Sequence, residues 1–354
     1  MNRVKNIRKI MELNNLDAFL VTSMQNIKYL SNFTGTTGKV LITKDHQYFL
    51  TDFRYLSQAS SQCEGYEIVN VGYEYAENLE KIINNATVGF EGNVMTYDEY
   101  KHFEATCKSI LFKSVSLDEL RMIKDEEEIN KIIKANEISL EALDYVLENI
   151  LIPNKTTEIE LRRALETKMN ELGASGPSFD LIIASGVRSS LPHGVASDKI
   201  IEEGDFLTID FGCYYKGYVS DITRTFAVTK LPDEELVKIY DIVLKAQLLG
   251  VEAIKPGIKI SEVDKVVRDY ITEQGYGEYF GHGTGHGIGI EIHEEPYVRG
   301  NRETVLEPGM VITVEPGIYL PNIGGVRIED DVLVTETGYK VLTNYEKELK
   351  VIRK

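Results

Sequence analysis

The sequence predicts an α/β amino-terminal domain over residues 1–117 and an α+β domain over residues 118–354 that consists of two similar halves. Three observations support this prediction. Short helix and strand patterns alternate in the first region. In the second region the order of a helix, a proline, a second helix, a glycine and strands occurs twice. Each of these repeats also contains a hairpin that carries two acidic residues.

The first domain has the periodicities of short elements. A first helix places Val4, Ile7, Ile10 and Met11 on one face. We expect strands at 18–22, 40–43, 48–51, 66–71 and 87–90, and helices at 53–61, 75–83 and 97–106. The Asp, Glu and His residues of this domain form no cluster with the spacing of metal ligands. We therefore expect it to have a structural or gating role.

Composition excludes several classes of protein. The 56 acidic and 39 basic residues give a net charge of −17, which disfavours nucleic acids and anionic membranes as partners. The three cysteines include no closely spaced pair, which suits a reducing compartment. Acidic and amide residues interrupt the basic amino terminus, and no apolar run approaches about 18 residues. We expect a cytoplasmic protein without a membrane segment.

Capping signals mark where three of the four predicted helices of the second domain begin, and Pro232 starts the other. In each, an Asp, Ser or Thr is followed three residues later by an acidic residue. The pairs are Asp125 with Glu128, Thr157 with Glu160, and Ser261 with Asp264. A proline follows the first helix of each half and a glycine follows the second. The duplication therefore predicts two halves with similar architecture.

An acidic residue interrupts the first apolar strand of each half. Asp210 lies in the run Phe206–Phe211, where an unpartnered carboxylate would be costly. Lys216 and Gly217 form the hairpin turn, so we expect Asp210 and Asp221 to lie opposite each other across the ladder. Two carboxylates at that separation repel each other unless they share a proton or a metal.

The second half repeats this arrangement. The segment Leu306–Tyr319 aligns without a gap on Ile201–Tyr214, and the alignment places Glu315 on Asp210. The returning strand supplies Glu329, after a wider turn. Acids that merely cap turns need not recur at matched depth inside two apolar strands. We therefore expect the four acids to meet between the two halves.

Three of the six histidines lie in one glycine-rich segment, Gly281–Pro296. They are His282, His286 and His293, and five glycines separate or flank the first two. One histidine with four carboxylates describes a site for two metal ions with mostly oxygen ligands, which favours manganese, with cobalt or zinc as alternatives. Such a pair of ions activates a water and polarises a carbonyl, which predicts amide or ester hydrolysis.

Together these segments resemble the pita-bread metallopeptidases, specifically the bacterial Xaa-Pro aminopeptidases and Xaa-Pro dipeptidases. The resemblance covers essentially the whole chain, including Asn26–Gly35 and Thr51–Tyr55 in the first domain. It implies a creatinase-like amino-terminal domain and a pita-bread catalytic domain with an internal pseudo-twofold duplication. It also implies a homodimer.

The resemblance further implies roles for individual residues. The metal ligands would be Asp210, Asp221, His286, Glu315 and Glu329. Glu315 would also assist the proton transfers. The substrate-binding residues would be His193, His282, His293 and Arg327. Among these, His293 would bind the carbonyl or its tetrahedral intermediate, and His193 would lie near the residue after the scissile bond. Arg327, with Tyr319, would also orient the ligands.

Within this family we expect an Xaa-Pro aminopeptidase, which releases the first residue from peptides with proline in second position. A dipeptidase must bind a carboxylate directly after the proline, and family dipeptidases often place an arginine after the His-Glu-x-Pro sequence. Here Tyr297 follows Pro296. The alternative is an Xaa-Pro dipeptidase, or prolidase, in which Arg299 or Arg302 binds that carboxylate.

Other classes fit the sequence less well. Methionine aminopeptidases share the five ligands but typically lack a first domain of this type. Creatinase-like C–N hydrolases and pita-bread proteins that serve only as binding modules share the fold but lose the metal ligands, whereas this chain has a suitable residue at all five positions. We therefore expect a metallo-aminopeptidase.

Overall fold

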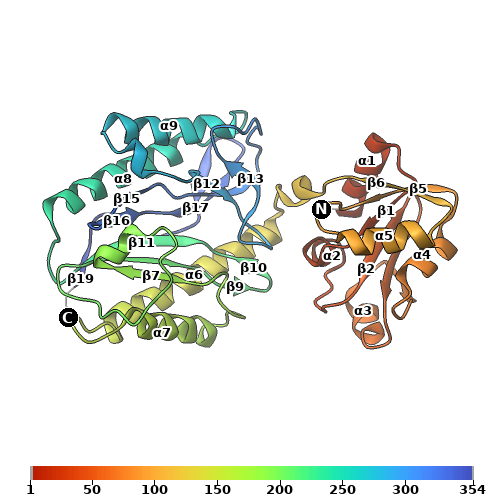
Figure 1. Ribbon diagram of the computed structural model, residues 1–354, viewed down its shortest axis with the longest axis horizontal. Helices are drawn as coiled ribbons and strands as arrows, with labels where there is room; N and C mark the ends of the chain where they lie inside the picture. The colour runs from red at the N-terminus through yellow and green to blue at the C-terminus, as the bar shows by residue number, and fades with distance from the viewer. Residues whose placement is uncertain (1–2, 353–354) are drawn as a thin grey trace. The chain divides into compact units, whose positions relative to one another are not determined.

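The computed structural model describes residues 3–352. Internal contacts divide the chain into two compact units, Met1–Leu120 and Arg121–Lys354. Each unit has its own β-sheet or sheets and its own hydrophobic clusters (Figure 1). Among the described residues, no helix is long and apolar enough to cross a membrane.

The first unit is built on one mixed sheet with the strand order β4-β3-β2-β1-β5-β6. Its strands are β1 (Ala18–Val21), β2 (Lys39–Thr43), β3 (Gln47–Thr51), β4 (Glu67–Asn70), β5 (Ala86–Phe90) and β6 (Ile110–Ser114). Its α-helices are α1 (Arg3–Asn14), α2 (Met24–Ser31), α3 (Leu56–Gln62), α4 (Tyr75–Ile82) and α5 (Tyr97–Thr106). β2 pairs antiparallel with both of its neighbours, and the remaining neighbouring strands are parallel. This confirms the predicted α/β domain.

Two elements of this unit, α2 and β6, were not expected from the sequence. The helix α2 has only 8 residues, too few for a clear apolar period, and end caps define it. The Ser23 side chain accepts a hydrogen bond from the Asn26 amide, and Asn32 ends the helix in the left-handed conformation with a φ of 59°. The strand β6 is mostly exposed because it lies at the sheet edge.

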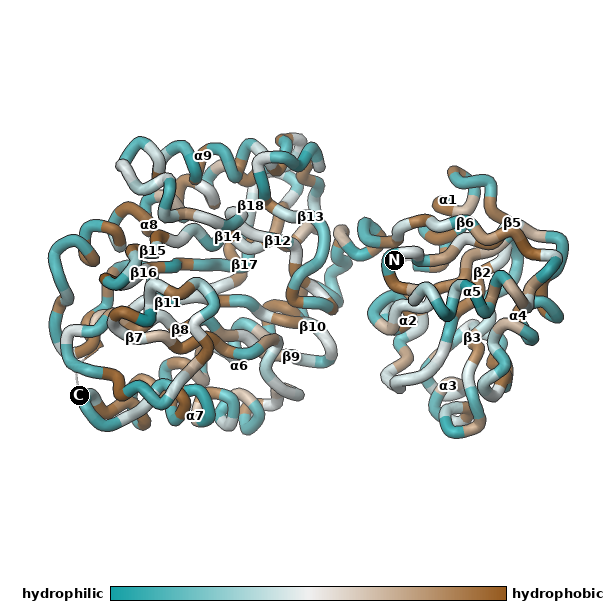
Figure 2. Tube along the Cα trace, viewed as in Figure 1, coloured by the Kyte–Doolittle hydropathy of each residue, from teal (hydrophilic) through white to brown (hydrophobic). Residues whose placement is uncertain are grey.

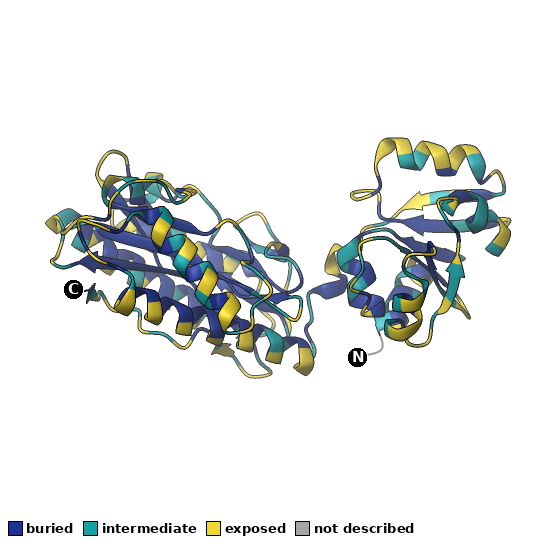
Figure 3. Ribbon diagram, turned by 90° about the horizontal axis from the view of Figure 1, so that it is seen from below, coloured by how far each residue is buried: buried dark blue, intermediate teal, exposed yellow. Residues whose placement is uncertain are grey.

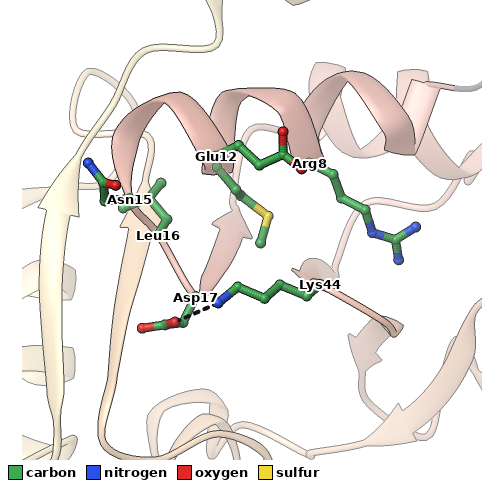
Figure 4. Close-up of a pocket in the computed structure, with 7 residues that line it drawn as sticks. Arg8, Glu12, Asn15, Leu16, Asp17 and Lys44 are labelled. Atoms are coloured by element: carbon green, nitrogen blue, oxygen red, sulfur yellow. Dashed lines mark hydrogen bonds and ion pairs between the residues drawn. The ribbon is translucent and has the colours of Figure 1, made fainter.

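A cavity of about 360 Å³ lies beside α1 in this unit (Figure 4). Three of its charged side chains bind groups of the same unit. Asp17 accepts the Thr87 amide at 2.9 Å and pairs with Lys44 at 3.2 Å, and Arg8 donates to the Thr43 carbonyl at 3.0 Å. These contacts connect α1 and β1 to neighbouring backbone, which indicates a structural role.

The second unit contains two larger sheets, β19-β11-β8-β7 and β13-β12-β14-β17-β18, and two small hairpins, β9-β10 and β15-β16. The strands of the first sheet and hairpin are β7 (Ile182–Ser185), β8 (Phe206–Phe211), β9 (Tyr214–Tyr215), β10 (Tyr218–Val219), β11 (Ile222–Val228) and β19 (Val351–Ile352). Those of the second sheet and hairpin are β12 (Gly285–Gly287), β13 (Glu294–Val298), β14 (Val311–Val314), β15 (Gly317–Leu320), β16 (Gly324–Arg327), β17 (Asp330–Val334) and β18 (Tyr339–Val341).

Each half of this unit packs a pair of helices against its strands (Figure 1). The helices are α6 (Glu126–Asn149), α7 (Glu158–Glu171), α8 (Glu234–Ala253) and α9 (Ile260–Glu273). Leu143 of α6 and Leu161 of α7 share a cluster with Ile209, while Tyr240 of α8 shares one with Ile318. The apolar segments of Figure 2 and the buried sides of the helices in Figure 3 follow this packing. The arrangement confirms the predicted α+β pita-bread domain with an internal duplication.

The predicted caps of the first two helices are confirmed, since capping boxes begin α6 and α7. The predicted cap of Ser261 with Asp264 is wrong because α9 already begins at Ile260. Asp264 is buried and instead accepts hydrogen bonds from the amide and the hydroxyl of Thr284, at 3.2 and 2.8 Å. It therefore connects α9 to the segment that precedes His286.

The first acid hairpin has a different register from the expected one. Asp210 pairs with Thr223, so it does not lie opposite Asp221. The strands keep one register on both sides of the turn, because Tyr215 pairs with Tyr218. Asp221 is two residues before Thr223, so the strand period of two brings both carboxylates to the same face of the sheet. In the second half, Val314 pairs with Asp330. Glu315 follows Val314 and Glu329 precedes Asp330, so both acids lie at the end of this strand pair.

Candidate metal centre

The ends of several strands of the second unit surround one cleft of about 630 Å³. Asp210 lies in β8, Asp221 directly precedes β11, and His286 is in β12. Glu315 directly follows β14, and Glu329 lies between β16 and β17. Residues from both halves therefore face the same space, as the duplication predicted.

His286 has the protonation state of a metal ligand. Burial lowers its pKa to about 3, and the neighbouring His293 adds to this effect, so the ring is neutral at pH 7. Its Nδ1 lies 3.1 Å from the Gly287 carbonyl, which can only accept a hydrogen bond, so we place the proton on Nδ1. The lone pair of Nε2 then points between the carboxylates of Asp221 and Glu315, each 3.5 Å away.

Each buried acid of the cleft makes ionisation of the others less favourable. Burial first, and then the neighbouring carboxylates, raise the pKa values of Asp221 and Glu329 well above their ordinary range. Burial also raises the pKa of Glu315 to about 8, with Asp210 contributing and Arg327 opposing. A bound cation would remove this repulsion.

Two further observations fit a metal ion. Ligand atoms of Asp221, His286 and Glu329 all lie within 4.8 Å of one another. The Oδ1 atom of Asp210 is buried and has no hydrogen-bond partner among residues 3–352, which is rare for a carboxylate unless something else binds it. The oxygen-rich donor set, with one imidazole, is typical of divalent cations. This group can therefore hold metal.

Arg327 connects the carboxylate cluster to the cleft wall. Its Nη2 donates to Oδ2 of Asp210 at 2.5 Å, and its Nη1 donates to the Tyr319 hydroxyl at 2.8 Å. Its Nε donates to the Thr223 hydroxyl at 3.2 Å, and that hydroxyl donates to Glu329 at 2.6 Å. One buried guanidinium therefore fixes two acids, Asp210 directly and Glu329 through Thr223.

The three predicted substrate-side histidines also line the cleft. His193 is exposed, in the loop after β7, and the ring of His293 lies 4.3 Å from that of His286. His282 is more enclosed, since its Nε2 lies 3.0 Å from the Tyr319 hydroxyl and burial lowers its pKa to about 4. The structure thus brings every predicted site residue to one cleft, while their roles stay predictions.

Other residues that support the ligands were not found from the sequence. Arg224 donates to the carbonyl oxygens of Thr223 and Glu329 at 2.9 and 2.5 Å and pairs with Asp330 at 2.8 Å. Asp331 accepts the backbone amide of Asp221 at 3.2 Å. The available signals were an arginine within the apolar strand β11 and two further acids directly after Glu329.

The glycines on either side of His286 allow β12 to lie close to its neighbouring strands. A Cβ on Gly285 would lie 2.0 Å from the Thr313 carbonyl oxygen, and one on Gly287 would lie 2.5 Å from that of Glu295. β12 is therefore confined between β13 and β14, and only glycine fits on either side of His286.

Comparisons with known proteins agree with this geometry. The family model for metallopeptidase family M24 matches residues 130–336, and the creatinase/prolidase N-terminal domain matches residues 3–123. The Xaa-Pro dipeptidase of Pyrococcus horikoshii is 42% identical, over 98% of each chain. The structure of an Xaa-Pro dipeptidase from Bacillus anthracis is 48% identical, with a TM-score of 0.94 over 99% of each chain.

An aminopeptidase is also among the similar structures. The X-Pro aminopeptidase of Thermotoga maritima is 37% identical, with a TM-score of 0.88 over 97% of this chain and 100% of that one. The family predicted from the hairpin acids and the histidine segment is thus confirmed. The chain belongs to metallopeptidase family M24, with a creatinase/prolidase amino-terminal domain, and is a hydrolase.

Proposed function

We propose that this protein is an Xaa-Pro dipeptidase, which cleaves the bond before proline in dipeptides. The observation that supports this proposal is full-length similarity, at 48 and 42% identity, to proteins named Xaa-Pro dipeptidases. The sequence favoured an aminopeptidase because Tyr297 follows Pro296. Aminopeptidase activity stays the second candidate, because the chain is also 37% identical to the X-Pro aminopeptidase of Thermotoga maritima.

The proposed cofactor is a pair of divalent metal ions, with manganese first and cobalt or zinc as alternatives. The residues that would hold it are Asp210, Asp221, His286, Glu315 and Glu329. When bound, such ions lower the pKa of a shared water and polarise the scissile carbonyl. Measurement of bound metal by mass spectrometry after loading with manganese, cobalt or zinc tests this step, and a folded protein that retains none of them would contradict it.

Glu315 has the position and the chemistry of a proton carrier. Burial raises the pKa of its carboxyl to about 8 in the metal-free protein, and bound cations would oppose that rise, so the carboxylate that accepts a proton belongs to the metal-loaded protein. In the proposed reaction it accepts a proton from the attacking water and transfers that proton to the proline nitrogen as the bond breaks. Its backbone amide donates to the Thr284 carbonyl at 2.8 Å, which fixes its place at the end of β14.

His293 and His193 are proposed to act on the substrate. Both are exposed to the cleft, so a peptide can reach them. His293 lies beside His286 and can donate a hydrogen bond to the carbonyl oxygen as negative charge develops there. We place His193 near the proline residue, and His282 and Arg327 in the wall, where they orient Tyr319 and Asp210.

The decisive experiment compares kcat/KM for a dipeptide such as Ala-Pro with that for the tripeptide Ala-Pro-Ala, with manganese present. A dipeptidase cleaves Ala-Pro with much the higher kcat/KM. Preference for the tripeptide would support the aminopeptidase instead. The homodimer implied by the resemblance stays a prediction, and light scattering that gave a mass near 40.0 kDa would contradict it.

A further inference from the structure

A cluster of buried charges lies next to the histidine segment. Its centre is the Glu294 carboxylate, which binds two cations. Nε of Arg121 donates to Oε2 at 3.1 Å, and Nζ of Lys124 pairs with Oε1 at 2.7 Å. Another guanidinium nitrogen of Arg121 pairs with Glu291. The side chains of Lys124, Glu294 and Arg121 are 1, 3 and 8% exposed, so solvent hardly screens these charges.

Lys124 depends on Glu294 for its counter-charge. Within residues 3–352, Glu294 is the only acid at ion-pair distance from the ammonium group of Lys124. The pair also fills a defined space, since a Cβ on Gly289 would lie 2.3 Å from Oε1 of Glu294 and 3.1 Å from Cε of Lys124. The backbone amide of Lys124 donates to the Gly309 carbonyl at 2.9 Å. Lys124 is therefore held at both its backbone and its ammonium group.

Glu294 connects this cluster to the candidate metal centre. It is the first residue of β13 and pairs with Gly287, the residue after His286. His293 directly precedes Glu294, is exposed and lines the cleft, whereas Glu294 is buried. Successive side chains of an extended chain point to opposite sides. Contacts that fix Glu294 therefore also limit the positions that the His293 ring can take.

Stability alone does not account for such a cluster. Charged groups lose their hydration when they are buried, and apolar side chains of similar size often stabilise a fold as well or better. A buried ion pair does restrict the positions of its members, because separating unscreened charges is costly. Residues 288–293, all of which the structure describes, form no helix or strand, so no regular backbone ladder holds His293. The ion pairs of Glu294 supply a fixed point directly after it.

We propose that Lys124 and Arg121 are positioning residues for His293 and act through Glu294. This inference rests on the proposed function, in which His293 donates a hydrogen bond to the scissile carbonyl oxygen. That bond matters most as negative charge develops in the transition state, so it depends on where the imidazole lies. A displacement of about 1 Å can lower a rate roughly 100-fold. Loss of the buried ammonium group should therefore slow the reaction, although Lys124 itself contacts no substrate.

The test is a double-mutant cycle between Lys124→Met and His293→Ala in the manganese-loaded enzyme, with Ala-Pro and Ala-Pro-Ala as substrates. Lys124→Met alone should lower kcat about 10- to 100-fold and leave KM within about threefold, because the affected hydrogen bond belongs to the transition state. In the His293→Ala background the same substitution should change kcat by no more than about twofold, since its target is already absent. A residue with a purely structural role would instead give losses that multiply.

Lys134→Met is the matched control. Lys134 also lies in the amino-terminal part of the second unit, within α6, and pairs with Glu137 at 2.9 Å. Its side chain is 49% exposed, so its ion pair contributes little. The control should leave kcat within about twofold in both backgrounds. Bound manganese, measured by mass spectrometry, should be equal in all variants, which separates an effect on His293 from an effect on the metal ligands.

Arg121→Gln provides a second, milder variant. It removes one cation and leaves the pair of Lys124 with Glu294 in place. We expect a smaller loss of kcat than in Lys124→Met, and this loss should also disappear in the His293→Ala background. Should Lys124→Met fail to fold, the cycle between Arg121→Gln and His293→Ala decides in the same way.

The outcomes separate the inference from the function on which it rests. If His293→Ala lowers kcat but Lys124→Met does not, or if their losses multiply, Lys124 does not act through His293 and the inference is wrong. If His293→Ala has no effect, the role proposed for His293 is wrong and the inference fails with it. A wild type that prefers Ala-Pro-Ala would overturn the dipeptidase function and leave the inference intact, since both peptides present the same scissile carbonyl.

Discussion

Arg327 donates a 2.5 Å hydrogen bond from Nη2 to Oδ2 of Asp210, while Oδ1 of the same carboxylate is buried without a partner in the described part of the chain. The guanidinium thus fixes the orientation of the carboxylate by one oxygen and leaves the other for a cation. This division of the two oxygens explains how a buried arginine can support a metal site without competing for it.

Substitution of Arg327 by lysine should test that arrangement. Lysine keeps the charge but has a single nitrogen, so it cannot replace the three nitrogens that donate to Asp210, Tyr319 and Thr223. We expect metal affinity and kcat to fall about 10- to 100-fold, the usual range for residues that orient metal ligands. Calorimetric titration of the metal-free protein with manganese measures the change in metal affinity. Unchanged affinity and kcat would show that Asp210 needs no such support.

Removal of an acidic ligand should have a larger effect. In Asp210→Asn one anionic ligand is lost, and in Glu315→Gln the proton carrier is lost as well, so kcat should fall by orders of magnitude. Circular dichroism and thermal unfolding should show that both variants are folded. If either variant kept more than a tenth of the wild-type kcat at saturating metal, the ligand assignment would be wrong.

The stability of the metal-free protein should depend on pH. Burial raises the pKa of Glu315 from 4.5 to about 8 and that of Asp331 from 3.8 to about 8. Between these pKa values the folded state binds protons that the unfolded state has lost. The contribution of these two groups to the free energy of unfolding is therefore highest below about pH 4 and falls as the pH rises to about 8. Other groups that titrate in this range add their own slopes.

Thermal unfolding of chelator-treated protein at pH 5.5, 7.0 and 8.5 measures this effect. The expected melting temperature decreases with pH, and added manganese should raise it most at pH 8.5, where the acids are ionised. Glu315→Gln is the matched control, because an amide cannot ionise and the decrease should be smaller. A melting temperature that rises with pH in both proteins would contradict the prediction.

The sequence predicted the site better than it predicted the strand register. Asp210 and Glu315 could be recognised because each interrupts an apolar strand, and a buried carboxylate needs a partner whatever the fold. The position of Asp221 was wrong by two residues, because the hairpin pairs Asp210 with Thr223. The error did not alter the site, since a shift of two residues keeps a side chain on the same face of a strand.

Residues that act at long range were not predictable in this way. Arg224 contacts Asp330 and the Glu329 carbonyl, which are more than a hundred residues away in the chain. Only the fold brings these groups together. Ser261 and Asp264 show the opposite error. Their spacing fits a helix cap, but Asp264 instead makes a buried contact with Thr284. Tertiary contacts thus override a local preference of about 1 kcal/mol.

The last prediction concerns Glu158, a fully buried carboxylate at the start of α7. It accepts hydrogen bonds from the amides of Ser185 and Ser197 at 2.8 and 3.1 Å and from both hydroxyls at 2.9 and 2.7 Å. It also pairs with Arg188. Ser185 and Ser197 lie on either side of the loop that carries His193, so the Glu158 side chain binds both ends of that loop.

Glu158→Gln should therefore loosen the loop. The amide nitrogen of glutamine would face donors only, which costs roughly 1–3 kcal/mol of stability, and we expect kcat/KM for the dipeptide to fall about tenfold with metal content unchanged. The control is Glu160→Gln in the same helical turn, where an exposed acid caps α7 and, within the described residues, makes no hydrogen bond with the loop. This control should lose a little stability and no activity. Equal kinetic losses in both variants, or none in Glu158→Gln, would show that the loop does not depend on this carboxylate.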